Sequence, residues 1–204
     1  MKHIPVLKDE AIKLLNIKPD GVYLDLTLGR AGHASEILKH LTTGKLIAFD
    51  LDKDAIKESK PILDKISSRY EVIHSNYCFF DQYVKDKVDG ILLDLGVSSP
   101  QFDDPSRGFS YQVDALLDMR MNVDAKLTAK QLLNTLPINE LTKILREYGE
   151  EKDAFKITFN PNGGEWDLTE DVHELKGKYG EQLESSFFFL TIFRMKFMML
   201  PVSV

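Results

Sequence analysis

The sequence predicts an α/β fold with a doubly wound, mostly parallel sheet, and three observations support this. Short apolar runs alternate with helix-type periodicity over the first hundred residues. A loop that holds Gly29 and Gly32 follows the first apolar run. Two later runs end in an acid, Asp50 and Asp94. Ligands of open α/β sheets bind beyond the carboxyl ends of the strands, so these features predict a ligand site at that edge.

The individual elements follow from local patterns. Residues 9–15 form an expected amphipathic helix with Asp9 and Glu10 near its positive end. The expected strands cover residues 22–26, 45–50, 70–74 and 88–94. The expected helices between them cover residues 34–41, 54–66 and 79–84. Pro61 should kink or interrupt the second of these helices, because proline lacks an amide proton.

The character of the chain changes after Gly96. Residues 96–108 are a long, turn-rich segment, and such segments in a compact domain are usually functional or disordered. Helices are expected at 129–136, with Thr128 as N-cap, and at 137–147. Residues 159–166 are loop-like. The apolar run 187–200 is too short to span a bilayer.

Composition limits the classes of function. The chain has 204 residues, of which 43% are hydrophobic, enough for a globular core. Its net charge of −6 argues against a protein that coats nucleic acid, but it allows an enzyme that reads RNA through a local patch. The single cysteine and the scattered histidines predict neither a disulfide framework nor a metal site. We expect a cytoplasmic protein that does not associate with membranes; the oligomeric state stays open.

The loop and the strand-end acids discriminate among nucleotide ligands. Asp50 lies 18 residues after Gly32, close to the spacing of an acid that binds ribose hydroxyls. The loop lacks the full dinucleotide fingerprint, and the chain lacks the phosphate-binding loop of NTPases. An adenosyl ligand without pyrophosphate needs only an open glycine loop, a ribose acid and a polar adenine edge. The sequence therefore favours an adenosyl ligand without pyrophosphate, such as S-adenosylmethionine, as the cofactor.

The segment after the fourth apolar run indicates the acceptor chemistry. Methyl transfer to an exocyclic amine needs acceptors that orient the NH2 group and an aromatic surface that holds the base. We assign Asp94, Ser98 and Ser99 as candidate catalytic residues. Further polar groups are the carbonyl before Pro100 and the Gln101 amide. Candidates for the aromatic surface are Phe102, Phe109 and Tyr111.

Seven separate segments, in one order, give the chain a family resemblance over residues 1 to about 152. They are His3-Ile-Pro-Val-Leu-Lys-Asp-Glu10, Asp25-Leu-Thr-Leu-Gly-Arg-Ala-Gly-His33, Asp50-Leu-Asp-Lys-Asp-Ala55, Gly90-Ile-Leu-Leu-Asp-Leu-Gly-Val-Ser-Ser-Pro-Gln101, Arg107-Gly-Phe-Ser-Tyr111, Leu117-Asp-Met-Arg-Met121 and Tyr148-Gly-Glu-Glu151. Together they resemble the bacterial small-subunit (16S) ribosomal RNA cytosine-N4 methyltransferases, which use S-adenosylmethionine.

The resemblance implies a class I methyltransferase (Rossmann-like) fold with a helical insertion after the fourth strand. It divides the chain into a methyltransferase domain at 1–102, a loop and the start of the insertion at 103–152, and a divergent segment at 153–204. The implied reaction methylates the N4 amine of a cytidine, which makes ribosomal RNA and the small ribosomal subunit the implied partners. Carried over by position, the cofactor contacts are Ala31, Gly32, His33, Asp50, Tyr77, Asp94 and Gln101.

The chain departs from the family pattern at three places. Ala31 stands where the family usually has glycine, a mild change if the backbone angle there is negative. Leu116 replaces a usual proline. The resemblance stops near residue 152, and we interpret residues 153–204 as a truncated or frameshifted end that leaves the sheet incomplete. One alternative is a truncated, non-catalytic relative that binds S-adenosylmethionine or RNA; another, a small-molecule methyltransferase, would lack the match at 102–121.

Several single residues have two interpretations. Asp25 is either a cofactor-site acid or an acceptor that orients the loop. His33 either lines the site or caps a helix, and Tyr77 either stacks on the adenine or belongs to the core. Arg107 and Arg120 are interpreted as salt-bridged structural residues rather than RNA contacts.

Overall fold

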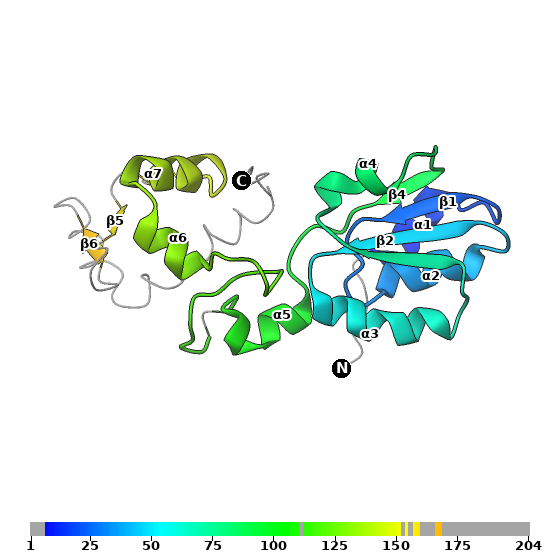
Figure 1. Ribbon diagram of the computed structural model, residues 1–204, viewed down its shortest axis with the longest axis horizontal. Coiled ribbons are helices and arrows are strands. Elements are labelled where there is room, and N and C mark those ends of the chain that lie inside the picture. Colours follow the sequence, from blue (N-terminus) through cyan, green and yellow to red (C-terminus); the bar gives the residue numbers. More distant parts are fainter. Residues whose placement is uncertain (1–6, 111, 152–153, 155–156, 160–165, 169–204) are drawn as a thin grey trace. The chain divides into compact units, whose positions relative to one another are not determined.

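The computed structural model describes residues 7–110, 112–151, 154, 157–159 and 166–168 (Figure 1). The chain divides into two compact units, residues 1–95 with 121–123 and residues 96–120 with 124–204, and we describe each by itself. Tyr111 and the apolar run 187–200 lie outside the described residues. In the part of the chain that is described, no helix has the length and apolar character needed to cross a membrane.

The first unit is built on a parallel sheet with the strand order β3-β2-β1-β4. Its strands are β1 (Val22–Asp25), β2 (Lys45–Asp50), β3 (Tyr70–His74) and β4 (Gly90–Leu92). Its helices are α1 (Lys8–Leu15), α2 (Gly32–His40), α3 (Lys53–Asp64), the 3-10 turn η1 (Tyr77–Phe79) and α4 (Phe80–Tyr83). This is the strand order with which doubly wound nucleotide-binding sheets begin, so the predicted α/β class is confirmed.

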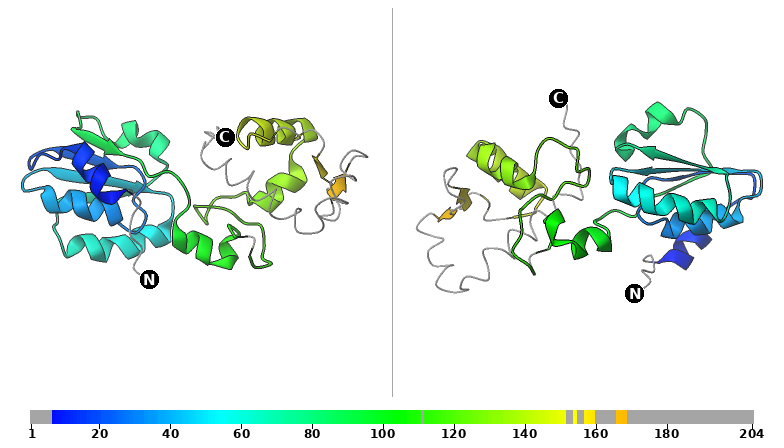
Figure 2. Two further views of the ribbon diagram at one scale, coloured as in Figure 1. Left: turned by 180° about the vertical axis from the view of Figure 1, so that it is seen from behind. Right: turned by 60° about the horizontal axis from the view of Figure 1, so that its bottom comes forward.

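Alternate residues of the central strands face two apolar clusters, one on each side of the sheet. Tyr23 and Leu46 pack with buried residues of α2 and α3. Leu24 and Phe49 belong to a second cluster, against which half-buried residues of 73–88 pack. Figure 2 shows α1, α2 and α3 (blue to cyan) on one face and α4 (green) on the other. Helical segments therefore cover both faces, as a doubly wound sheet requires.

Two expectations for this unit differ from the structure by more than a shift of one or two residues at an element's end. The strand expected at 88–94 is paired only over Gly90–Leu92, because the backbone beyond it leaves the ladder. The expected interruption at Pro61 is wrong, since α3 continues to Asp64. Pro61 is exposed and lies in the last turn of α3, where its missing N–H removes only one helical hydrogen bond.

The second unit is mostly helical. It contains α5 (Ser99–Asp103), the 3-10 turn η2 (Pro105–Arg107), α6 (Ala129–Thr135), α7 (Ile138–Glu147) and an antiparallel pair of strands, β5 (Ile157–Phe159) and β6 (Trp166–Leu168). The predicted N-cap is confirmed: the Thr128 hydroxyl accepts from the Gln131 N–H, and the Thr128 N–H donates to the Gln131 side chain. Leu141 and Leu145 of α7 are buried in a cluster with Ala154.

Two features of the second unit were not predicted. The segment 96–108 is not turns alone, because it contains α5 and η2. Of the stretch 159–166, which was expected to be loop-like, residues 160–165 lie outside the described residues; its ends, Phe159 and Trp166, pair as part of β5 and β6. Among the described residues, no strand after β4 joins the four-stranded sheet.

The turn before β2 leaves no room for a side chain at residue 44. A Cβ on Gly44 would lie 2.1 Å from the Gly21 carbonyl oxygen. This oxygen cannot easily move, because it accepts a hydrogen bond from the Lys45 N–H at the start of β2. Three successive N–H groups, of residues 42–44, also donate to the Pro19 carbonyl. We expect Gly44→Ala to lower the free energy of unfolding by about 2 kcal/mol, measured by urea unfolding followed by circular dichroism.

Gly29→Ala is the matched control for this substitution. Gly29 has a φ of +51°, but the nearest atom to its added Cβ, the Thr27 carbonyl oxygen, lies 3.9 Å away. Only the backbone angle opposes the change, so the cost should not exceed about 1 kcal/mol. Equal losses in both variants would contradict the steric explanation for Gly44.

Candidate functional site

The loop between β1 and α2 is held against the carboxyl end of β2. The Leu28 N–H donates to the Phe49 carbonyl at 2.9 Å, and the Gly29 N–H donates to Asp50 Oδ2 at 2.8 Å. Within the loop, the Ala31 N–H donates to the Leu28 carbonyl at 2.9 Å. These bonds fix the backbone of a loop in which Leu28 and Ala31 are buried and Gly29 is half-buried.

Ala31 adopts the left-handed conformation, with φ 60° and ψ 28°. Alanine in place of the family's usual glycine would be a mild change only at a negative φ, and φ at Ala31 is positive. An L-residue in this region is strained by about 1 kcal/mol. Ala31 is also the N-cap of α2, with Gly32 as the first helical residue. The cap position is thus taken, which rules out the interpretation of His33 as the capping residue.

Asp50 ends β2 and uses both carboxylate oxygens. Oδ2 accepts from the Gly29 N–H, and Oδ1 accepts from the Asp52 N–H at 2.8 Å. Burial raises the pKa of Asp50, while the two N–H groups oppose that rise. Each carboxylate oxygen can accept a second hydrogen bond. The carboxylate is therefore positioned by the backbone and can still accept from a pair of hydroxyls.

Asp25 ends β1 and is 1% exposed. Its Oδ1 accepts from the Thr27 N–H at 3.1 Å, so it orients the start of the loop. Its buried Oδ2 has no hydrogen-bond partner among the residues that the structure describes. Burial raises the pKa of Asp25 to about 7; the Thr27 N–H opposes this, and the charges of Asp50 and Asp94 add to it. The orphaned oxygen would be relieved by a donor or a positive charge.

Asp94 follows β4 by two residues, and its side chain is 51% exposed. Its Oδ2 lies 3.7 Å from Nδ1 of His33, a residue that is 7% exposed. Its N–H donates to the Thr27 hydroxyl at 2.7 Å. The carboxyl ends of β2 and β4 thus bring Asp50 and Asp94 to the same loop, as the strand-end pattern predicted, and Asp25 at the end of β1 joins them.

Tyr77 begins η1, directly after β3. The Ser75 N–H donates to the Asp50 carbonyl at 3.1 Å, which holds this segment beside the end of β2. The Tyr77 ring is half-buried and packs against the apolar cluster of Leu24 and Phe49, and burial raises its pKa. Core packing is therefore part of its role, and stacking on an adenine stays a prediction.

Three predicted site residues belong to the second unit. Ser98 caps α5, and its N–H donates to Gln101 Oε1 at 3.1 Å. Gln101 is buried and Ser99 is half-buried. The structure thus gathers Ala31, Gly32, His33, Asp50, Tyr77 and Asp94 in the first unit, and Ser98, Ser99 and Gln101 around the start of α5. The suggestion that Phe109 stacks on a base is wrong for this structure, because its side chain is fully buried.

The sequence profile of the MraW methylase family matches residues 1–160. This chain belongs to the MraW methylase family. Three relatives are named ribosomal RNA small subunit methyltransferase H. Those of Mycoplasmopsis agalactiae and Exiguobacterium sibiricum are each 52% identical over 160 residues, covering 76% of this chain and 53% and 51% of theirs. That of Lachnospira eligens is 50% identical over 161 residues, covering 76% of this chain and 51% of its own.

The chain spans about half the length of the curated relatives it matches. A solved rRNA methylase from Streptococcus thermophilus superposes with a TM-score of 0.39 at 21% identity, covering 47% of this chain and 57% of that one. This structural likeness is weak, so the family assignment rests on the sequence matches alone. The family resemblance read from the motifs is confirmed. With the parallel sheet in the order β3-β2-β1-β4, so is the predicted class I methyltransferase fold.

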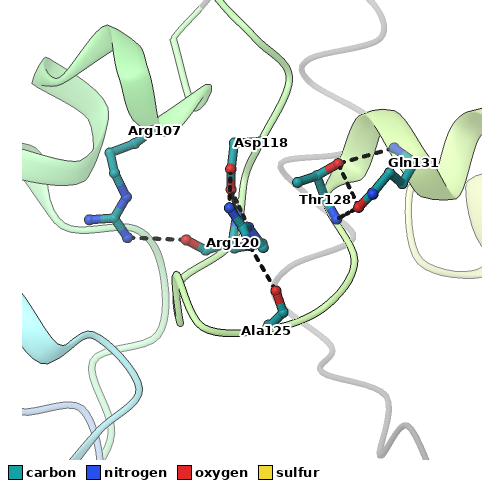
Figure 3. Close-up of polar contacts among 6 residues, drawn as sticks. All are labelled: Arg107, Asp118, Arg120, Ala125, Thr128 and Gln131. Carbon is teal, nitrogen blue, oxygen red and sulfur yellow. Dashed lines mark hydrogen bonds and ion pairs between the residues drawn. The ribbon is translucent and has the colours of Figure 1, made fainter.

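In this MraW family member, Arg107 and Arg120 both make hydrogen bonds that hold a loop of the second unit (Figure 3). Arg120 forms a two-pronged pair with Asp118, at 2.8 Å from Nε to Oδ1 and 2.6 Å from Nη2 to Oδ2. Its Nη1 donates to the Ala125 carbonyl, and Arg107 Nη2 donates to the Arg120 carbonyl at 3.1 Å. The interpretation of Arg120 as a salt-bridged structural residue is confirmed, and Arg107 supports the same loop.

Sequence reasoning missed two contacts of the MraW-type glycine loop. Arg30 binds Glu58 of α3 through both Nε, at 2.7 Å, and Nη2, at 3.3 Å. The Thr27 hydroxyl accepts from the Asp94 N–H. The spacing of Asp25 and Thr27 could have indicated the bond from the Thr27 N–H to the Asp25 carboxylate, but not the contact of the Thr27 hydroxyl. No group of three or more His, Cys, Asp or Glu within the described residues is arranged to hold a metal ion.

Proposed function

We propose that this chain carries the S-adenosylmethionine-binding part of an enzyme that methylates the N4 amine of a cytidine in small-subunit ribosomal RNA. Membership of the MraW methylase family and the names of the relatives support this proposal. The observation that carries it in the structure is the meeting of Asp25, Asp50 and Asp94 at one glycine loop. The substrate proposed, a ribosomal RNA, is also the reason to propose a cytoplasmic location.

The residues present fit an adenosyl sulfonium ligand. Asp50 keeps acceptor positions for two ribose hydroxyls after binding the Gly29 N–H. The orphaned Oδ2 of Asp25 lies among acids and lacks a positive partner in the described chain, which suits a cationic ligand. The proposed cofactor contacts are Ala31, Gly32, His33, Asp50, Tyr77, Asp94 and Gln101. When bound, S-adenosylmethionine supplies an electrophilic methyl group.

Asp94 has the properties of the acceptor that orients the target amine. Its carboxylate is half-exposed, while its backbone is fixed by Thr27. A carboxylate accepts a hydrogen bond from an NH2 group and so directs the nitrogen lone pair. The nitrogen loses one proton as it gains the methyl group, and Asp94 or water takes that proton. Ser98 and Ser99, at the start of α5, are the further residues proposed to hold the base.

The experiment that tests the function is methyl transfer from labelled S-adenosylmethionine to small ribosomal subunits and to their isolated RNA. We expect N4-methylcytidine in the digested RNA, identified by mass spectrometry of nucleosides. Cofactor binding in a calorimetric titration without any transfer would instead favour the non-catalytic alternative. Labelling of a small molecule but not RNA would favour a small-molecule methyltransferase.

A further inference from the structure

The end of β4 is fixed by a side chain rather than by the sheet. The register pairs Asp25 with Leu92, and the Leu26 N–H donates to the Leu92 carbonyl at 3.0 Å. In a regular parallel ladder, the N–H two residues after Leu92, which is that of Asp94, would donate to a backbone carbonyl of β1. Here the Asp94 N–H donates to the Thr27 hydroxyl at 2.7 Å. The hydroxyl takes the place of a strand carbonyl at the point where β4 leaves the sheet.

Thr27 is itself held in position. Its N–H donates to Oδ1 of Asp25, a carboxylate buried at the end of β1. The β-branched side chain restricts rotation about χ1, so a fixed backbone also fixes the hydroxyl. The side chain is half-buried, which limits the access of water that would otherwise compete for the Asp94 N–H.

The same loop approaches the other end of Asp94. His33, six residues after Thr27, places Nδ1 3.7 Å from Asp94 Oδ2. Thr27 thus holds the Asp94 backbone while His33 lies beside its carboxylate. Both residues flank the strained stretch of Gly29 and Ala31, so the loop that is proposed to receive the cofactor also determines where Asp94 lies.

We infer that Thr27 is a positioning residue, whose hydroxyl anchors the Asp94 backbone and thereby holds the Asp94 carboxylate in the orientation that methyl transfer requires. The catalytic part of this inference rests on the proposed function. The anchoring part concerns the fold of this chain alone, and the two are measured separately.

The test compares two substitutions at one position. Thr27→Val keeps the branched shape and removes the hydroxyl, whereas Thr27→Ser keeps the hydroxyl. The Asp94 amide is followed by NMR hydrogen exchange on the full chain. We expect its exchange to be about ten-fold faster in Thr27→Val and within about three-fold of the parent in Thr27→Ser. Methyl transfer at saturating cofactor should fall about ten-fold in Thr27→Val and be retained in Thr27→Ser.

Thr42→Val is the matched control. The Thr42 hydroxyl donates to the Pro19 carbonyl at 3.3 Å, at the end of the same sheet where β1 and β2 begin. Its removal should change neither Asp94 exchange nor transfer. Circular dichroism checks that all three variants fold.

Each outcome decides one claim. Unchanged Asp94 exchange in Thr27→Val overturns the anchoring, whatever the activity. Faster exchange with an unchanged transfer rate upholds the anchoring and overturns the positioning role. Faster exchange in a chain whose parent transfers no methyl group upholds the anchoring while the proposed function itself fails.

Discussion

Replacing Asp50 by alanine is expected to weaken S-adenosylmethionine binding at least about 100-fold. Hydrogen bonds to a charged acceptor contribute about 1.5–3 kcal/mol each, and the proposed pose has two of them, to the ribose hydroxyls. The substitution also removes the acceptor of the Gly29 N–H, so the loop that receives the ligand loses an anchor. Isothermal titration calorimetry with the parent and the variant gives the ratio of the two dissociation constants.

Asp20→Ala is the control for that titration, because Asp20 is exposed in the turn before β1 and therefore lies at the opposite end of the strands from Asp50. Its affinity should match that of the parent. Asp50→Asn separates the two effects of the alanine variant, since it keeps an oxygen for the Gly29 N–H and loses the charge. An Asp50→Ala variant that binds the cofactor like the parent would sink the ribose assignment.

The second large effect is a loss of stability between pH 5 and pH 8 that Asp25→Asn should reduce. Burial raises the pKa of Asp25 from 3.8 to about 7, so the folded chain holds this proton more tightly than the unfolded chain. The contribution of Asp25 to stability is full below pH 4 and is lost as the pH rises through 7. A pKa difference of this size corresponds to up to about 4 kcal/mol. Asparagine cannot ionise, so the variant should gain stability over the parent at pH 8 relative to pH 5.

Urea unfolding at pH 5 and pH 8 measures this difference, with Asp89→Asn as a control that should not change the difference between the two pH values. The pKa of Asp89 is lowered by the Val22 N–H and by Lys18, so its stabilisation is present above pH 4 and lost in acid. Removing it should lower stability by the same amount at pH 5 and at pH 8. If Asp25→Asn shows the same change between the two pH values as the parent, the carboxyl is not protonated in the fold at pH 5.

The regular part of the fold was predictable because two local signals agree there. Strands β2 and β3 have the predicted bounds, since a turn precedes each and their apolar residues continue to a polar end. The apolar pattern of 88–94 overstated β4, because an apolar run does not show where strand pairing ends; Leu93, just beyond the paired residues, is 47% exposed. The β5–β6 pair was missed because three-residue strands are too short to show a period.

The sequence indicated which residue types form the site, but not which hydrogen bonds connect them. Strand-end position placed Asp50 and Asp94 at one edge, since parallel strands share their carboxyl ends. No sequence pattern states which hydroxyl replaces a ladder carbonyl, so Thr27 was missed. The orphaned oxygen of Asp25 and the burial of Phe109 also depend on tertiary packing, which a single sequence does not show.

The left-handed backbone at Ala31 has a consequence for how this position can change over time. Alanine there is strained by about 1 kcal/mol, yet it restricts the unfolded chain more than glycine does, by about 0.4–1 kcal/mol in favour of folding. Its methyl group is also buried, which adds a smaller benefit of the same sign. These terms offset part of the strain, so exchange between alanine and glycine at position 31 should change stability by no more than about 1 kcal/mol. The proposed cofactor contact of Ala31 constrains the position independently of stability.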